Sequence, residues 1–381
     1  MVEPDGRSSR ALLLQWHITD RCNLRCAHCY QESRSDGGLT LPELLSILEQ
    51  YKALLGLWRG QTKRPVRGHV TLTGGEPFVR EDLWNLLEIL SACRPLLSFA
   101  LLTNGTLIDG VIARRLRKLR PAFVQVSIEG SPTIHDAVQV SIEGSPTIHD
   151  AIRGSGSFDR AVRGLEHLTA AGVRTLISFT ASRLNYREFP EVARLGRRLG
   201  VSRVWADRLV PYGAGAALRD QMLTPEQTRE FVQIMRDAQN QTVLRWFRRR
   251  HTEIAMHRAL QFLAGGGVPY RCTAGDKLIA IQPDGDVYPC RRMPIRVGNV
   301  METPLASLYS DSPVLRALRD RCRTPDGCGG CLYARTCQGG LRCLSYALTG
   351  DLFSSDPGCW ISRPRKPATP ATLTSPAPCS T

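Results

Sequence analysis

Three cysteines near the N-terminus, Cys22, Cys26 and Cys29, are spaced C-x3-C-x2-C directly after an apolar segment. Thiolates at short spacing bind either zinc or an iron–sulfur cluster, and zinc or structural sites are the more common case. On a 4Fe–4S cube, however, three protein thiolates leave one of the four irons open to a ligand that is not protein. An open iron is a place where chemistry can occur. The cysteines alone leave both interpretations open.

A second motif lies on the next predicted strand. Residues 69–77 read HVTLTGGEP, an alternating strand that ends in Gly74, Gly75, Glu76 and Pro77. Paired glycines allow the backbone to come close to a ligand, and Glu76 offers an anionic acceptor at the carboxyl end of the strand. Such a turn is weak evidence alone, but after the cysteine run it favours the catalytic cluster.

Together the two motifs resemble those of the radical S-adenosylmethionine (SAM) enzymes. The resemblance implies that Cys22, Cys26 and Cys29 hold a 4Fe–4S cluster whose open iron binds SAM, and that SAM is cleaved reductively to a 5′-deoxyadenosyl radical. An electron donor such as a flavodoxin or a ferredoxin is then implied as a partner. The residues implied in SAM binding are His28, Gly74, Gly75, Glu76, Pro77, Asn104, Ser141, Glu143 and Arg153.

Strand and helix signals alternate along the first 210 residues. A capping box at Thr40 and Glu43 opens the first helix, and later helices are expected near 81–93, 108–119, 158–171 and 187–199. Strands are expected at 12–19, 69–73, 97–103, one VQVS segment, 173–182 and 201–207. Six βα units in series predict a parallel sheet that binds ligands at its carboxyl ends. The predicted fold is therefore α/β, a partial (β/α)6 barrel over 11–210 after an extension at 1–10, as the resemblance also implies.

A tandem duplication interrupts this pattern. Residues 124–137, VQVSIEGSPTIHDA, are repeated without change as residues 138–151. Both copies cannot occupy one strand position, so we expect one copy to be looped out. In the peptide-modifying enzymes that this chain resembles, a Ser that binds SAM precedes an Arg-Gly pair. The spacing from Ser141 to Arg153 is close to the spacing in those enzymes. We therefore expect the second copy to form the strand, and the first copy, with Ser127, to extend the preceding loop.

A second group of cysteines lies between residues 272 and 359, after an expected helical linker region at 211–270. A turn at 283–285 predicts a hairpin within it. Four-cysteine zinc ribbons are the simpler interpretation, but the order of the cysteines resembles the SPASM extension of radical SAM maturases, which binds auxiliary 4Fe–4S clusters. The predicted SPASM-type Fe–S module covers 271–361, and the Pro-rich and Ser-rich residues 362–381 are expected to be a disordered tail.

The SPASM resemblance also implies which cysteines bind which cluster. Cys328, Cys331, Cys337 and Cys359 would hold the distal cluster, and Cys272, Cys290 and one further cysteine the proximal one. Leu341 stands where a proximal ligand is expected, so Cys343 or Cys322 would have to replace it. We accordingly expect one or two auxiliary 4Fe–4S clusters.

Composition limits the remaining possibilities. The chain has 381 residues and a formal net charge of +15, but its arginines are spread over expected helices, which indicates solvated faces rather than a nucleic-acid site. No segment is long and apolar enough for a membrane span, and no signal peptide precedes the short apolar run that carries Gln15 and His17. Thirteen cysteines with metal-binding spacing fit a reducing cytoplasm best.

The function expected from these features is hydrogen abstraction from a residue of a peptide or protein, as in thioether, carbon–carbon or formylglycine formation. Leader recognition is expected from a separate binding protein or from the 208–270 segment. Two alternatives remain: oxidation or decarboxylation of a small molecule such as a sugar or tetrapyrrole, and a non-catalytic Fe–S binding protein. Asp207, at the end of the sixth strand, is either an acid–base group or an ordinary surface residue.

Overall fold

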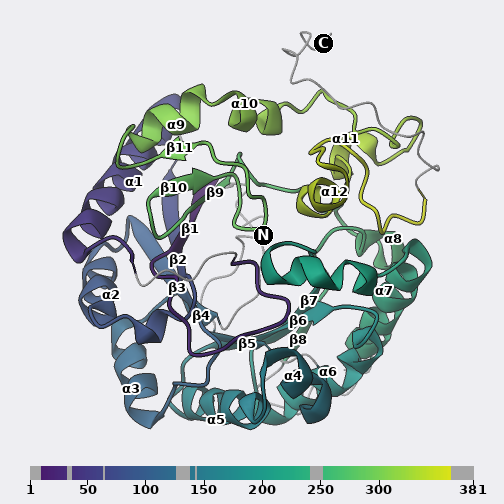
Figure 1. Cartoon of the computed structure of the whole chain (residues 1–381), viewed down its shortest axis with the longest axis horizontal. Helices are drawn as coiled ribbons and strands as arrows, with labels where there is room; N and C mark the ends of the chain where they lie inside the picture. The colour runs from purple at the N-terminus through teal and green to yellow at the C-terminus, as the bar shows by residue number, and fades with distance from the viewer. Residues whose placement is uncertain are drawn as a thin grey trace.

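One sheet forms the centre of the molecule and helices form a ring around it (Figure 1). The computed structural model describes residues 10–31, 37–62, 65–125, 138–141, 144–240 and 252–361. Within these ranges the sheet has eleven strands, in the order β11-β10-β9-β1-β2-β3-β4-β5-β6-β7-β8. The strands lie inside this ring of helices (Figure 1).

All strand pairs from β1 to β8 are parallel, which confirms the predicted α/β barrel-type sheet. Parallel strands place their carboxyl ends at one rim, where ligands bind in such folds. The strands are β1 (Arg10–His17), β2 (Val66–Thr73), β3 (Leu97–Leu102), β4 (Phe123–Gln125), β5 (Val138–Ser141), β6 (Thr175–Ala181), β7 (Arg203–Arg208) and β8 (Glu253–Ala255).

Helices cover the outside of this sheet and bury its apolar face. The capping box predicted for the first of them is present, because Glu43 Oε2 accepts hydrogen bonds from the backbone N–H and the hydroxyl of Thr40, both at 2.7 Å. Helix α4 was not predicted from the sequence. The helices are α1 (Leu41–Thr62), α2 (Leu83–Ala92), α3 (Gly110–Leu119), α4 (Pro146–Arg153), α5 (Ser157–Ala170), α6 (Phe189–Leu199) and α7 (Pro225–Asn240).

The duplicated segment contributes to two strands instead of one. β5, from the second copy, pairs with β6 and leads through 144–145 into α4, which ends at Arg153. The first copy is not wholly looped out, however, because its residues Val124 and Gln125 extend β4 beside β3. The two copies touch where Gln125 pairs with Gln139. The rest of the first copy, including Ser127, lies outside the described residues.

The cysteine-rich region continues the barrel sheet rather than forming a separate unit behind it. The predicted hairpin is confirmed as β9 (Leu278–Ile281) and β10 (Asp286–Tyr288), and β9 pairs in parallel with β1, with Leu13 opposite Leu278. This pairing gives β1 a partner on its otherwise open edge. The region 211–270 likewise is more than a helical linker, because β8 adds to the other end of the sheet beside β7.

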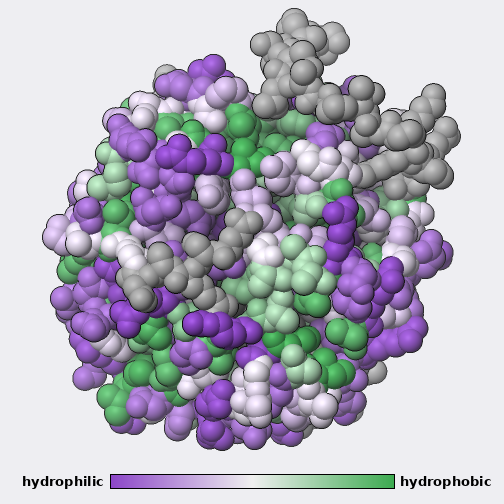
Figure 2. All heavy atoms as spheres, viewed as in Figure 1, coloured by the Kyte–Doolittle hydropathy of each residue, from purple (hydrophilic) through white to green (hydrophobic). Residues whose placement is uncertain are grey.

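The remaining helices and strands are short. They are η1 (Pro77–Val79), η2 (Tyr186–Glu188), η3 (Gly213–Gln221), α8 (Phe262–Gly265), β11 (Gly298–Asn299), α9 (Leu305–Asp311), α10 (Pro313–Arg319), α11 (Ala334–Cys337) and α12 (Arg342–Thr349). Hydrophilic residues spread over most of the face drawn in Figure 2, as expected for solvated helix surfaces. Among the described residues, no helix has the length and apolarity that a membrane span requires.

Candidate functional site

Cys22, Cys26 and Cys29 line one cavity next to the carboxyl ends of β1 and β2. The cavity measures about 610 Å³ including its open mouth. Five residues that the sequence assigned to SAM binding share its lining, and so do five to which the sequence assigned no role in the site. The first group is His28, Gly74, Gly75, Asn104 and Arg153, and the second is His17, Leu24, Tyr30, Gln31 and Arg291.

The paired glycines allow the end of β2 to pack on the chain that enters the cysteine loop. An ideal Cβ on Gly74 would lie 2.2 Å from the carbonyl oxygen of Thr19, and one on Gly75 would lie 2.1 Å from that of Arg21. The backbone N–H groups of Gly75 and Glu76 donate to these same two oxygens at 2.8 Å. The glycines are therefore needed for contact with the cysteine loop itself, in addition to any approach to a ligand.

Two further backbone contacts fasten the middle and the end of the cysteine loop. The N–H of Ala27 donates to the carbonyl of Ile152 in α4 at 2.9 Å, and the N–H of Gly215 in η3 donates to the carbonyl of Cys29 at 3.3 Å. The loop is thus held by β2, by α4 and by η3. Elements far apart in the sequence fix the directions of the three thiols.

Glu76 lies behind the wall of the cavity instead of lining it. Its side chain is fully buried. Its carboxylate accepts hydrogen bonds from the Thr103 hydroxyl and the Asn104 N–H, both at 2.7 Å, and from the Phe78 N–H at 3.1 Å. Burial raises the pKa of Glu76 to about 7, against the lowering effect of these donors. Glu76 therefore ties the end of β2 to the end of β3 and fixes Asn104.

Two side chains direct N–H groups at cysteine sulfurs. Asn104 Nδ2 lies 3.9 Å from Cys22 Sγ, and Arg153 Nη1 lies 3.8 Å from Cys26 Sγ. Arg153 Nη2 also lies 3.2 Å from His28 Nε2, and burial lowers the pKa of His28 well below its usual value, so the ring is neutral. N–H groups that face metal-ligating sulfurs tune the reduction potential of a cluster.

The structure describes two of the three other residues that the sequence implied in SAM binding. Ser141 is the last residue of β5, at the carboxyl end of the sheet, where ligands of parallel sheets bind. Pro77 is buried at the start of η1 and does not line the cavity. Glu143 lies outside the described residues.

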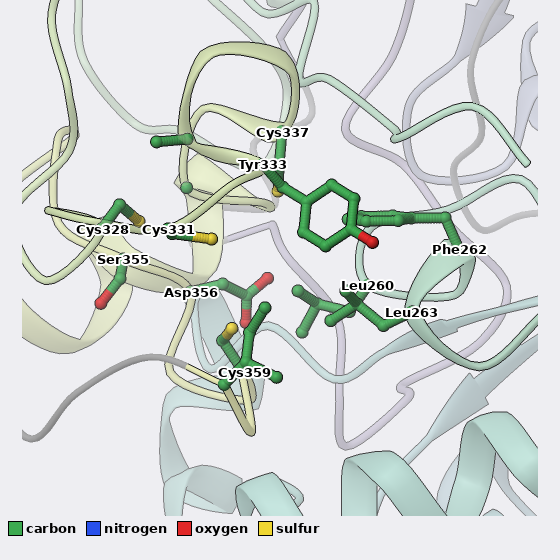
Figure 3. Close-up of a pocket in the computed structure, with 13 residues that line it drawn as sticks. Leu260, Phe262, Leu263, Cys328, Cys331, Tyr333, Cys337, Ser355, Asp356 and Cys359 are labelled. Carbon is green, nitrogen blue, oxygen red and sulfur yellow. The ribbon is translucent and has the colours of Figure 1, made fainter. Parts of the chain in front are cut away.

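The four cysteines predicted for the distal cluster line a second cavity, of about 340 Å³. Figure 3 shows Leu260, Phe262 and Leu263 across this cavity from the cysteines. Burial raises the pKa of Cys337 to about 12. The four residues are Cys328, Cys331, Cys337 and Cys359.

A buried ion pair connects this second cavity to the barrel. Both oxygens of Asp356 accept from the guanidinium of Arg208 in β7, at 2.6 and 2.7 Å. Asp356 also accepts from the backbone N–H groups of Leu341 and Gly358, at 3.0 and 2.9 Å. The segment that carries Cys359 is therefore positioned by a barrel strand.

Cys272, Cys290 and Cys343 line a third cavity, of about 500 Å³, together with Leu341. Burial raises the pKa of Cys290 and that of Cys343 to about 12. Cys322, the other candidate for the proximal site, is not part of this lining. The geometry thus brings three thiols together and places the apolar Leu341 beside them.

Asp207 is not a surface residue but part of a buried ion-pair network. It is 4% exposed, and its Oδ2 accepts from Arg292 at 3.1 Å and from Arg258 at 3.0 Å. Both arginines line the third cavity. The sequence did not predict a role for Arg258 or Arg292, because both pair with Asp207, which is distant from them in the sequence. Gln15 and His17 did carry a signal, as polar residues that alternate within the apolar first strand.

Each of the three cysteine sets consists of thiols that share one cavity, which is a donor set that fits an iron–sulfur cluster. In the described part of the chain, no group of three or more His, Cys, Asp or Glu side chains is placed to hold a single metal ion.

Comparison with known proteins agrees with this geometry. Residues 16–196 match the family model described as the Radical SAM superfamily, and residues 272–332 match that of SPASM, an iron–sulfur cluster-binding domain. The SPASM match favours Fe–S clusters over the zinc ribbon that the cysteines of this region could also have indicated.

Among curated proteins, the chain is similar to the AdoMet-dependent heme synthase of Oleidesulfovibrio alaskensis, with 27% identity covering 96% of this chain and 90% of that protein. It is also similar to the mycofactocin maturase MftC of Mycolicibacterium smegmatis, with 29% identity covering 91% and 82%. Among solved structures, anSMEcpe with bound AdoMet and the Cp18Cys peptide has a TM-score of 0.69 at 18% identity, covering 92% of this chain and 94% of that one. This last likeness concerns the fold.

Proposed function

We propose that this protein abstracts a hydrogen atom from a residue of a peptide or protein. The chain belongs to the radical SAM superfamily and carries a SPASM domain. The observation that carries the proposal is the shared cavity of Cys22, Cys26 and Cys29, with N–H groups of Asn104 and Arg153 aimed at two of the sulfurs.

SAM and a 4Fe–4S cluster supply the radical chemistry, by one-electron reductive cleavage of SAM to methionine and a 5′-deoxyadenosyl radical that takes a hydrogen atom from carbon. In our proposal the three cysteines hold that cluster, and Asn104, Arg153 and the backbone at Gly74 and Gly75 orient SAM. The surrounding sheet excludes water from the reacting carbon. A flavodoxin-like or ferredoxin-like donor would supply the electron.

The auxiliary site adjoins this reaction space. Gln15 in β1 lines the proximal cavity, while His17, two residues later on the same face of the strand, lines the SAM cavity. We propose that Cys272, Cys290 and Cys343 would hold an auxiliary 4Fe–4S cluster, a group that would supply one-electron redox chemistry beside the SAM cavity. The distal set of Cys328, Cys331, Cys337 and Cys359 would hold a second.

The support for a peptide substrate comes from relatives. MftC is named a maturase, and the anSMEcpe structure contains a peptide. A leader segment of such a substrate would be recognised by a separate binding protein or by residues of the 208–270 region.

A small-molecule substrate is a second candidate, and two observations support it. Matching relatives include heme synthases and a pre-heme d1 synthase, which are named for tetrapyrroles. The buried arginines Arg258, Arg291 and Arg292 would also suit an anionic small molecule. The non-catalytic alternative is no longer supported, since the matching relatives are enzymes.

The position of deuterium after turnover distinguishes these candidates. The anaerobically reconstituted enzyme would be given SAM, dithionite and one of three fractions from cells grown fully deuterated: intact proteins, their tryptic peptides, or small molecules. Mass spectrometry would then measure deuterium in the 5′-deoxyadenosine formed, with the Cys26→Ala variant as the control. Deuterium from the protein or peptide fraction is the expected result. Deuterium from small molecules alone would favour the second candidate, and none from any fraction would refute hydrogen abstraction from these classes.

A further inference from the structure

Two buried polar side chains in the SAM cavity have no hydrogen-bond partner among the residues that the structure describes. They are His17, through both ring nitrogens, and Tyr30, through its hydroxyl. His17 ends β1 and is 5% exposed, and Tyr30 directly follows Cys29. A buried polar group without a partner is destabilising, so such groups in a cavity wall indicate a ligand that binds there.

Arg291 provides positive charge at the same place. Its guanidinium carbon lies 6.0 Å from the centre of the Tyr30 ring, and its Nη1 donates to the Thr73 hydroxyl at 3.3 Å, at the end of β2. The guanidinium of Arg291 supplies a positive charge and hydrogen-bond donors, as that of any arginine does near neutral pH. Arg291 also follows Cys290, which lines the proximal auxiliary cavity. His17, Tyr30 and Arg291, called here the wall triad, therefore lie where the two cysteine cavities meet.

Charge and hydrogen-bonding capacity together define the ligand group. A guanidinium and a phenol donate hydrogen bonds, and a neutral imidazole donates one through whichever ring nitrogen carries its proton. Burial and the neighbouring Arg291 lower the pKa of His17 to about 3, so the ring is neutral and adds no second charge. One positive charge and several donors in a partly dry wall match one carboxylate.

SAM also has a carboxylate, but the residues assigned to SAM approach different sulfurs. Asn104 faces Cys22 and Arg153 faces Cys26. Arg291 instead follows Cys290 of the auxiliary cavity directly, and it lies by the ring of Tyr30, the residue after Cys29. The wall triad thus lies on the side of the SAM cavity that faces the auxiliary site.

We propose that His17, Tyr30 and Arg291 form a subsite that binds a carboxylate of the substrate next to the carbon that loses its hydrogen. The proposal deepens the proposed function and rests on it, because it assumes a substrate in the space between the SAM and auxiliary sites. It holds for a peptide carboxylate and for a small-molecule carboxylate alike.

The first test measures binding and needs no turnover. The anaerobic holoenzyme with SAM would be mixed with the deuterated peptide and small-molecule fractions, each before and after methyl esterification of its carboxylates. Compounds retained after ultrafiltration would be quantified by mass spectrometry. We expect acids to be retained, with retention of their methyl esters at least 10-fold lower. Equal retention of acids and esters, or retention of no carboxylic acid, would overturn the subsite.

Variants assign the effect to the wall triad. Tyr30→Phe removes one hydrogen bond to a charged group and should weaken acid retention about 10- to 100-fold. Tyr346→Phe in α12, which removes a hydroxyl outside all three cavities, should match the wild type. Arg291→Lys keeps the charge but loses the planar fork, so it should fall between wild type and Tyr30→Phe. Wild-type retention by both wall-triad variants would refute the assignment.

Two further readouts separate the possible failures. Equilibrium dialysis of labelled SAM should give the same dissociation constant for Tyr30→Phe and wild type, with equal iron content. A 10-fold weaker binding of SAM would show that the wall triad serves SAM's own carboxylate, which contradicts the proposal. If acids are retained but no deuterium reaches 5′-deoxyadenosine, the proposed function fails while the carboxylate subsite stands.

Discussion

Replacement of Gly75 by alanine should separate the end of β2 from the cysteine loop. The new Cβ would lie 2.1 Å from the carbonyl oxygen of Arg21, and ordinary contact begins at 3.4 Å, so the two chains must move apart by about 1.3 Å. That movement breaks the hydrogen bonds from Gly75 to Thr19 and from Glu76 to Arg21, both 2.8 Å long. Two hydrogen bonds at about 1 kcal/mol each, with 1–3 kcal/mol of packing strain, give a loss of roughly 3–5 kcal/mol.

The loss should be concentrated at the SAM cavity, because Cys22 follows Arg21 directly. Iron and sulfide analysis of the anaerobically reconstituted variant should show about four fewer irons per chain, the content of one 4Fe–4S cluster. The thermal transition should also fall by several degrees. The auxiliary clusters bind elsewhere and should remain.

Gly56→Ala is the matched control, since an added Cβ there meets nothing within 4 Å. Gly56 lies inside α1, so alanine should leave iron content unchanged and raise stability by up to about 1 kcal/mol. Wild-type iron content and wild-type stability in Gly75→Ala would refute the view that this glycine permits the contact between β2 and the cysteine loop.

The remaining predictions concern the clusters, the duplication and the buried charges. Cys26→Ala should abolish 5′-deoxyadenosine formation but keep the iron bound by the 272–359 region, with Cys93→Ala as a fully active control; SAM cleavage by Cys26→Ala would contradict the cluster assignment. Metal analysis of the anaerobic protein should find iron and inorganic sulfide in that region, and stoichiometric zinc would count against the auxiliary clusters. Ser141→Ala should weaken SAM binding, measured by equilibrium dialysis, far more than Ser127→Ala, whereas equal effects would reject the choice of the second copy. Asp207→Asn leaves two buried guanidinium groups without their carboxylate and should cost roughly 3–5 kcal/mol in denaturant unfolding. Asp311→Asn, which alters an exposed ion pair with Arg316, should have no measurable effect, so equal results for the two Asp variants would rule out a structural role for Asp207.

Local signals predicted much of the barrel because its strands and helices carry clear periodicity. The capping box at Thr40, the turn at 283–285 and the apolar strands are all present as expected. The resemblance to the SPASM extension also indicated which thiols share a cavity, since Cys328, Cys331, Cys337 and Cys359 line one cavity and Cys272, Cys290 and Cys343 line another.

Other features could not be read locally because they depend on contacts between distant segments. The pairing of β9 with β1 joins Leu13 to Leu278, and no pattern in either strand indicates that the other is its partner. The burial of Asp207 depends on Arg258 and Arg292, which belong to later segments. The sequence also carried no sign of the three donors that hold the Glu76 carboxylate, which are Phe78 in η1 and Thr103 and Asn104 just after β3.

The pairing of β1 with β9 imposes an order on folding. Leu13 pairs with Leu278, so during synthesis one edge of β1 waits for a strand that emerges 265 residues later. At about 5–20 residues per second, that delay is on the order of 13–50 s. During this delay the edge of β1 that later binds β9 is unpaired, and it can pair with incorrect strands. Chains that are released early, before β9 is made, should therefore aggregate more readily than the complete protein, and a chaperone that covers this edge would raise the yield of soluble enzyme.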